Sequence, residues 1–301
     1  MKNIGTIIFR LTLSCLVAGA IMGTTFILTN KAKRHNEQLT EQRVMLGLLG
    51  YSAAHPAPAS LKMHEIYRYI VGEGDNTAVG YLVPLAGSDN GWAFLTIDLD
   101  GKLLARHDVT LAPEQATDEA ARQKAIAAAV GPEKPVRFAD QTIAVTDGGK
   151  LQAYLLPGGF PGFKGFVKVM LALSPDLTIR GLEIMEQEED PGLGAEIAQD
   201  YFKNQFQDKD FEHLKKLEVA KVPLPDEYRA ALEAGKTGRM GPEQVAAVES
   251  KYKDKDIYAL TGATISSRAV TSGVKGIVKK FAYRLAILDR IIKEQGIAVP
   301  F

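Results

Sequence analysis

Four hydroxyl side chains gather in one short stretch near the C-terminus, "LTGATISSRAV" (residues 260–270), at Thr261, Thr264, Ser266 and Ser267. A serine or threonine at the start of a helix ordinarily accepts a backbone N–H group of the first turn, and one hydroxyl is enough for that. Four hydroxyls beside a glycine, at the positive end of a helix dipole, also suit a phosphate group. The pattern alone leaves both interpretations open.

A second stretch of interest, "EEDPGLGAEI" (residues 188–197), is rich in glycine and follows a strand-like segment. Pro191, Gly192 and Gly194 interrupt that strand, and glycine lets the backbone approach another molecule closely. An ordinary connecting turn has the same composition. The stretch therefore predicts either a turn or a binding loop.

Two resemblances to nucleotide-binding loops fail in detail. "EAGKT" (residues 233–237) looks like the end of a P-loop, but Ala230 stands where the first glycine of that loop belongs. "GLGAEI" (residues 192–197) lacks the third glycine of the dinucleotide fingerprint. Neither stretch predicts a nucleotide site.

The element that must position the hydroxyls is a long helix. After Arg268, apolar residues recur at steps of three and four, which marks one face of a helix. These residues are Val270, Val274, Ile277, Val278, Phe281, Leu285, Leu288 and Ile292. The hydroxyl stretch is therefore predicted to be the N-terminal end of this helix.

The preceding chain reads as strands and shorter helices. Residues 91–109 and 165–186 alternate around turns at Asp100-Gly101 and Ser174-Pro175-Asp176, which predicts two hairpins. A single helix is predicted between them, from Pro113 to Gly131, and a polar helix is predicted through Phe202 and Phe206.

Residues 35–70 are predicted to form a helical stem that ends in a periodic piece; that piece contains Leu61, Ile66, Tyr67 and Ile70. Residues 220–256, which are rich in proline and glycine, predict a surface insertion of short helices and loops.

Composition limits the chemistry. The 301 residues are 46% hydrophobic, enough for one large or two modest domains. The chain has 36 Lys and Arg residues and 36 Asp and Glu residues, so no net positive charge favours the binding of nucleic acid. The single cysteine, Cys15, cannot hold an iron–sulfur cluster, a structural zinc or an intrachain disulfide. With five scattered histidines, no metal site is predicted.

Residues 11–29 form an uncharged run of 19 residues, long enough as a helix to cross most of a bilayer core of about 30 Å. A cleaved signal peptide fits less well, because the run is long and no small-x-small site precedes Lys31. Residues 1–34 are therefore predicted to be a membrane anchor, with the lipid bilayer as a partner. The basic residues on its two sides nearly balance, so charge does not decide the orientation.

These motifs together resemble a known family. "TGATISSRAV" resembles the flavinylation motif of FMN-binding domains in two proteins, the G subunit of the Rnf ion-translocating complex and the C subunit of the sodium-pumping NADH:quinone reductase. "EEDPGLGAEI" resembles their Glu-Thr-Pro-Gly-Leu-Gly loop, and "GFKGFVKVMLAL" resembles the strand before it. The resemblance covers the anchor and roughly residues 150–285, and "ISSRAV" favours the Rnf branch.

The resemblance implies a covalent FMN, joined by a phosphoester to Thr264. A threonine hydroxyl is a poor nucleophile without activation, so the resemblance also implies a separate flavin transferase that uses FAD as donor. It implies cofactor contacts but no catalytic residue in this chain. The other implied contacts are Thr261, Gly262, Ala263, Ser266, Ser267, Gly192, Leu193 and Gly194.

The implied fold class is α+β: one N-terminal transmembrane helix, then a soluble FMN-binding domain of antiparallel sheet with flanking helices. The expected parts are the anchor (1–34), a stem and N-terminal part of the soluble domain (35–150), and the FMN-binding domain (151–301) with its insertion (220–256). The resemblance places the anchor in the bacterial inner membrane and the soluble domain on its periplasmic side.

The implied function is that of an electron-carrying subunit in a ferredoxin:NAD oxidoreductase complex that translocates ions. Other membrane and iron–sulfur subunits would be its partners, and the chain would not turn over substrate alone. Two alternatives stay open. One is the C subunit of the quinone reductase, and the other is a membrane-anchored flavin-binding sensor or assembly module.

The chain departs from the family pattern at three positions. Tyr258 stands where the family has an aspartate six residues before the modified threonine, and Asp256 lies two residues further back. Asp190 replaces the threonine of the other loop, and Gln187 replaces a frequent histidine. Either the transferase uses Asp256, or attachment is inefficient.

Overall fold

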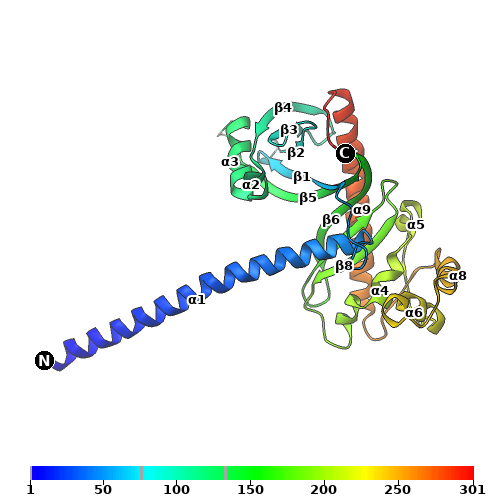
Figure 1. Ribbon diagram of the computed structural model, residues 1–301, viewed down its shortest axis with the longest axis horizontal. Helices are drawn as coiled ribbons and strands as arrows, with labels where there is room; N and C mark the ends of the chain where they lie inside the picture. The colour runs from blue at the N-terminus through cyan, green and yellow to red at the C-terminus, as the bar shows by residue number, and fades with distance from the viewer. Residues whose placement is uncertain (1, 75–76, 132–133) are drawn as a thin grey trace. The chain divides into compact units, whose positions relative to one another are not determined.

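A computed structural model describes residues 2–74, 77–131 and 134–301. The chain divides into two compact units, residues 1–47 and residues 48–301. The first consists of the helix α1 (Lys2–Leu48) (Figure 1). Within it, Ile4–Phe26 is long and apolar enough to cross a membrane. The predicted anchor therefore falls on a helix that contains a candidate membrane span.

The second unit is built on an eight-stranded antiparallel sheet in the order β4-β3-β2-β1-β5-β6-β7-β8. Its strands are β1 (Leu61–Val71), β2 (Ala78–Pro84), β3 (Gly91–Ile97), β4 (Leu103–Thr110), β5 (Val136–Asp147), β6 (Lys150–Pro161), β7 (Phe166–Leu173) and β8 (Ile179–Glu186). With helices packed against this sheet, the predicted α+β class is confirmed. The sheet runs through residue 150, so both predicted parts of the soluble unit contribute strands to it.

Both predicted hairpins are confirmed. β3 pairs with β4 across a turn in which Gly101 adopts a φ of 83°, and β7 pairs with β8 across the second turn. The turns form because Asp, Gly and Pro favour the backbone angles that a tight reversal needs.

The predicted helical piece at the end of the stem is wrong, because residues 61–71 form β1. Tyr67 and Tyr69 project into one cluster of buried side chains, whereas Ile66 belongs to the cluster on the other side of the sheet. This alternation has a period of two residues, and both faces are apolar because both are covered. The helical part of the stem ends at Leu48.

The helix predicted from Pro113 to Gly131 forms, but it is divided in two at Asp118. Two helices form, α2 (Pro113–Thr117) and α3 (Glu119–Val130). Asp118 separates them because its side chain accepts the N–H of Ala121 at 2.7 Å and so caps α3. Ala116 and Ile126 bring this pair against the cluster around Phe94.

The C-terminal part holds the remaining helices. The polar helix predicted through Phe202 and Phe206 is broken into three short pieces, since both rings turn inward and are fully buried. The elements are η2 (Gly194–Ala198), α4 (Asp200–Lys203), η3 (Asn204–Phe206), α5 (Phe211–Lys216), β9 (Val219–Ala220), α6 (Asp226–Leu232), α7 (Ala234–Thr237), α8 (Pro242–Tyr252), β10 (Ile257–Tyr258) and α9 (Thr264–Glu294).

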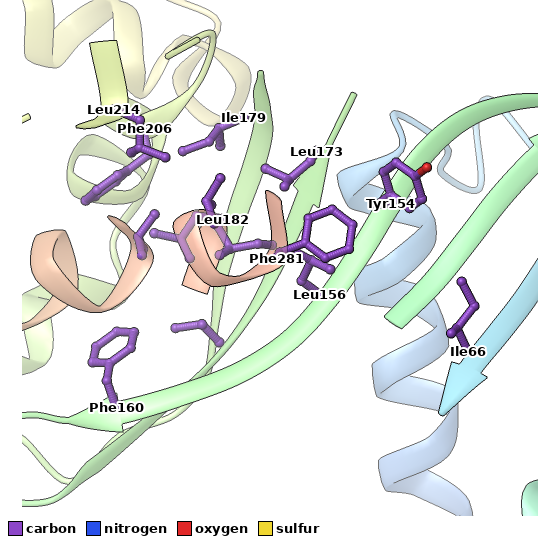
Figure 2. Packing of buried hydrophobic residues seen from close by; sticks show 14 of the residues in the cluster. Ile66, Tyr154, Leu156, Phe160, Leu173, Ile179, Leu182, Phe206, Leu214 and Phe281 are labelled. Carbon is purple, nitrogen blue, oxygen red and sulfur yellow. The ribbon is translucent and has the colours of Figure 1, made fainter. Parts of the chain in front are cut away.

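The predicted long helix is confirmed as α9. Its apolar stripe packs on the sheet, and Figure 2 shows Phe281 beside Tyr154 and Leu156 of β6. The rings of Phe281 and Tyr154 meet edge to face with 5.1 Å between their centroids. This packing places the start of α9 near the chain that follows β8, because α9 also contacts η2.

The segment 220–256, predicted as an insertion, contains the short helices α6, α7 and α8. It has a small core in which the rings of Tyr228 and Tyr252 stack with 4.4 Å between centroids. The P-loop-like residues of "EAGKT" lie mostly in α7, which agrees with their dismissal as a phosphate loop.

Candidate functional site

The start of α9 is not capped by any of the four hydroxyls. The N-cap residue is Ala263, which has no polar side chain. Ser267 Oγ accepts the N–H of Leu260 and donates to the carbonyl of Ala263, both at 3.0 Å. The capping interpretation is therefore wrong, because Ser267 braces the turn before the helix instead of closing the first turn.

The first turn of α9 keeps its donors available. The hydrogen-bond ladder of the helix begins with Ser267 N–H to Ala263 C=O at 3.0 Å, so the N–H groups of Thr264, Ile265 and Ser266 precede it. Within the described residues, the hydroxyls of Thr261 and Thr264 also have no hydrogen-bond partner. Unpaired amides at the positive end of a 31-residue helix form a potential anion-binding site, which we call the anion seat.

The glycine loop packs against this helix start. Its backbone turns back on itself, with Asp190 C=O accepting the N–H groups of Leu193 at 3.1 Å and Ala195 at 3.0 Å. The Leu193 side chain reaches Gly262, where a Cβ would lie 3.0 Å from Leu193 Cδ2. The structure thus brings together two stretches that lie about 70 residues apart in the sequence, as the prediction of one common site requires.

Leu193 remains 47% exposed although it touches Gly262. An apolar side chain held on a rigid turn beside an anion seat is available to contact a bound ring. Gly262 adopts a φ of 77°, which favours glycine and directs the chain from the loop into α9.

Glu189 joins the parts of the site and was not singled out from the sequence. It is only 4% exposed. Its Oε1 accepts the N–H groups of Phe163 at 2.6 Å and Lys164 at 3.1 Å, and its Oε2 accepts the hydroxyl of Ser266. One carboxylate therefore holds the β6–β7 turn, the glycine loop and the start of α9. The available signal was its match to the Glu of the resembled loop.

Gly194 is required by this arrangement. A Cβ there would lie 2.6 Å from Glu189 Oε2 and 2.7 Å from Ser266 Oγ. Because neither atom belongs to a freely moving side chain, any larger residue would disrupt the buried bond between Glu189 and Ser266.

Replacing Glu189 should therefore destabilise the protein strongly. Glu189→Ala leaves two backbone amides and the Ser266 hydroxyl without their acceptor, at a cost on the order of 2–4 kcal/mol. Glu188→Ala removes an exposed neighbour and should change stability by less than about 0.5 kcal/mol. Denaturant unfolding followed by the fluorescence of Trp92, the single tryptophan, measures both variants. Equal stabilities would contradict the bridging role.

A cleft of about 330 Å³ opens beside the glycine loop and the helix start. Its lining includes Leu193, Thr261, Tyr201 and Arg229. The Arg229 guanidinium lies 4.2 Å from the centroid of the Tyr201 ring, and the Tyr201 hydroxyl donates to Glu196 at 2.8 Å. Burial, together with the hydrogen bond to Glu196, raises the pKa of Tyr201 to about 12, so its hydroxyl stays protonated. The cleft thus offers aromatic and cationic contacts next to the anion seat.

The insertion supplies one wall of this cleft through Arg229, whereas β10 supplies Tyr258. Gln205 fixes Tyr258 by accepting its N–H at 2.7 Å. Asp256 is engaged elsewhere, since its carboxylate accepts the N–H of Glu218 at 3.0 Å. Tyr258, which stands at the position of the family's aspartate, is therefore part of the cleft wall, whereas Asp256 is bonded to the residue before β9.

Residues 162–279 match the FMN-binding domain family, and this range contains both loops, the insertion and the start of α9. The G subunit of the Na(+)-translocating ferredoxin:NAD(+) oxidoreductase complex of Acetobacterium woodii is 30% identical over 176 residues, which cover 57% of this chain and 69% of that protein. The chain belongs to this G-subunit family. The sequence-based resemblance to the family is confirmed.

Two further proteins are similar to this chain. The G subunit of the proton-translocating ferredoxin:NAD(+) oxidoreductase complex of Clostridium ljungdahlii is 31% identical over 137 residues, which cover 46% of this chain and 57% of that protein. The match thus spans a little over half of that relative's length. Among solved structures, NqrC of Shewanella oneidensis has a TM-score of 0.38 at 17% identity, over 72% of this chain and 77% of that one.

Proposed function

We propose that this member of the G-subunit family is an electron-carrying flavoprotein of a membrane ferredoxin:NAD oxidoreductase complex that couples electron transfer to ion translocation. We propose further that its FMN is joined to Thr264 through a phosphoester. The observation that carries the proposal is the meeting of the Gly192–Gly194 loop with the start of α9. There the Thr264 hydroxyl and three amides have no hydrogen-bond partner among the described residues. These groups suit a phosphate covalently held at a helix end.

Each polar group at the helix start has a separate role in this proposal. The N–H groups of Thr264, Ile265 and Ser266 bind phosphate oxygens, and Thr261 adds its hydroxyl. Ser267 and the Ser266 hydroxyl hold the turn through Leu260 and Glu189. Because no side chain among the described residues hydrogen-bonds to the Thr264 hydroxyl, activation of this weak nucleophile falls to a separate flavin transferase with FAD as donor.

The cleft beside Leu193 takes the flavin ring in this proposal. When bound, the flavin supplies electron transfer in single or paired steps. Leu193 and Tyr201 offer apolar and aromatic surface. The positive charge of the Arg229 guanidinium would stabilise negative charge on the ring. With a single cysteine, the chain leaves iron–sulfur chemistry to other subunits, which become its partners at the membrane.

Leu193→Ala tests where the ring lies. Removing this side chain admits water, which stabilises the charge gained on reduction, so the flavin potential should rise by about 30 mV, or about 1.4 kcal/mol for a two-electron couple. Redox titration of the flavinylated full-length protein measures this shift. Leu104→Ala, an exposed leucine of β4, is the matched control. Identical flavin potentials in the parent, Leu193→Ala and Leu104→Ala would show that the ring does not lie in this cleft. Gly194→Val is unsuitable here because it breaks the Glu189–Ser266 bond.

The soluble unit is proposed to lie on the periplasmic side of the bacterial inner membrane, with α1 as a single-pass anchor. Alkaline phosphatase fused after Phe301 should therefore be active in cells, whereas green fluorescent protein at the same position should stay dark if exported unfolded. The opposite result for the two reporters would place the unit in the cytoplasm.

A further inference from the structure

The central sheet opens between two neighbouring strands. β5 and β6 pair from Asp147↔Lys150 to Ile143↔Leu155. Beyond that point, residues 136–142 of β5 still pair with β1, and residues 156–161 of β6 still pair with β7. Within the described residues their facing edges have no strand partner, although Gln123 Nε2 donates to the Val136 carbonyl. The backbone of residues 138–142 and 156–159 therefore borders an opening.

Two local features of the sequence keep this opening in place. In the β1–β5 register, Arg68 pairs with Asp140 and Tyr69 with Phe138, so Ala139 is the extra residue of a bulge, and bulges bend a strand. On the other side, continuing the β5–β6 register would place residue 141 opposite Pro157, which has no N–H to donate. Both features disfavour continuation of the β5–β6 ladder, which ends at Ile143↔Leu155.

A groove of about 850 Å³ occupies the opening, and we call it the β5–β6 groove. Residues 139–142 and 156–159 line it consecutively. Only alternate residues of a strand line the face of a sheet, so a consecutive lining indicates that the strand edges border the groove. Ile277 and Phe281 of α9 add apolar surface.

The groove is strongly cationic. Its lining includes five cations, Arg68, Arg122, Lys168, Lys280 and Arg284, against two carboxylates, Glu119 and Asp140. Asp140 forms ion pairs with two of these cations: it pairs with Arg68, and its Oδ2 lies 3.2 Å from Arg284 Nη1. Lys168 pairs with Glu186 at 2.7 Å. Of the lining charges in the described structure, Arg122, Lys280 and Glu119 remain outside these pairs. The balance is positive and favours a negative occupant.

Arg122 is the most constrained of these cations. It is 4% exposed and forms no ion pair in the part of the chain that the structure describes. It donates to the Tyr69 hydroxyl at 3.1 Å and the Ala116 carbonyl at 2.6 Å, and it lies 3.8 Å from the centroid of the Tyr67 ring. A positive charge is thus fixed in the wall, and among the described residues no carboxylate lies within ion-pair distance of it.

We propose that the β5–β6 groove binds an extended acidic segment of a partner protein, which adds as a strand along the free edge of β5. The strand edge supplies main-chain hydrogen bonds, and the cations supply pairing for Asp or Glu side chains. A small anion would use the cations but not the strand edge, so the combination favours a peptide. This interaction does not depend on flavin attachment.

A fluorescein-labelled peptide of eight alternating Glu and Val residues provides the probe. Added to the purified full-length protein in detergent, it should bind saturably by fluorescence anisotropy and should slow hydrogen exchange of the amides at 136–142. Lys280→Glu should weaken binding about tenfold or more, because it puts a carboxylate in the groove. Lys279→Glu makes the same change at the adjacent exposed lysine outside the lining, and should weaken binding less than about twofold.

Lys280→Gln repeats the comparison with a smaller charge change if Lys280→Glu folds poorly. Absence of binding, or equal affinities for the Lys280 and Lys279 variants, would overturn the proposal. Equal competition by citrate without amide protection would assign a small-anion site instead, and competition by phosphatidylglycerol vesicles without protection would assign a lipid surface; either result also overturns it. Thr264→Ala should bind the peptide as the parent does, which separates this test from that of the flavin.

Discussion

Thr264→Ala should abolish covalent flavin when the full-length protein is produced together with a flavin transferase. The substitution removes the hydroxyl that we propose as the phosphoester oxygen, and the serines that follow it cannot replace it. Ser266 and Ser267 are buried and engaged with Glu189, Leu260 and the Ala263 carbonyl. The expected loss of attached flavin is therefore complete.

The measurement combines flavin fluorescence of the denatured band with the mass of the tryptic peptide 256–268, which contains all four hydroxyls. Ser272→Ala is the matched control, because it removes an exposed hydroxyl of the same helix outside the motif. Thr264→Ser should retain attachment, since it keeps the oxygen. Flavin mass persisting on the peptide of Thr264→Ala would exclude Thr264 as the attachment site.

The same substitution should stop electron flow through the whole complex. In membranes that contain all partner subunits, Thr264→Ala should lower ferredoxin-dependent NAD reduction by about a hundredfold or more, since no other redox group in this chain can replace the flavin. The single cysteine cannot hold an iron–sulfur cluster, and the sequence lacks the dinucleotide fingerprint. The anchor would contribute by keeping the carrier at high effective concentration beside its partners.

Assembly of the complex has to be measured alongside turnover, with Ser272→Ala as the control. Loss of NAD reduction in an assembled complex would place the flavin in the electron path. Turnover at the parental rate in Thr264→Ala would instead identify a sensor or assembly module. Loss of NADH-driven quinone reduction in place of ferredoxin-driven activity would identify the alternative role, that of the C subunit of the quinone reductase.

The spacing of residue types along the chain was sufficient to predict the elements whose exposed and buried sides alternate regularly or whose turns have typical residues. α9 was predictable because one face packs on the sheet and the other meets solvent, which imposes steps of three and four. The two hairpins were predictable because their turn residues favour reversal within a few positions. The same reasoning failed for β1, where burial on both faces hides the alternation and lets apolar residues mimic a helix.

The candidate site divides in the same way. Which residue types gather at the start of α9, and which glycines loosen the other loop, can be read from the chain alone because both depend on neighbours in the sequence. The contact of Leu193 with Gly262 and the bond between Glu189 and Ser266 follow from the tertiary fold, as does the lack of a partner for the Thr264 hydroxyl among the described residues. These contacts join segments tens of residues apart, and they exist because α9 packs across the sheet and carries its first turn to the glycine loop; no local pattern encodes that meeting.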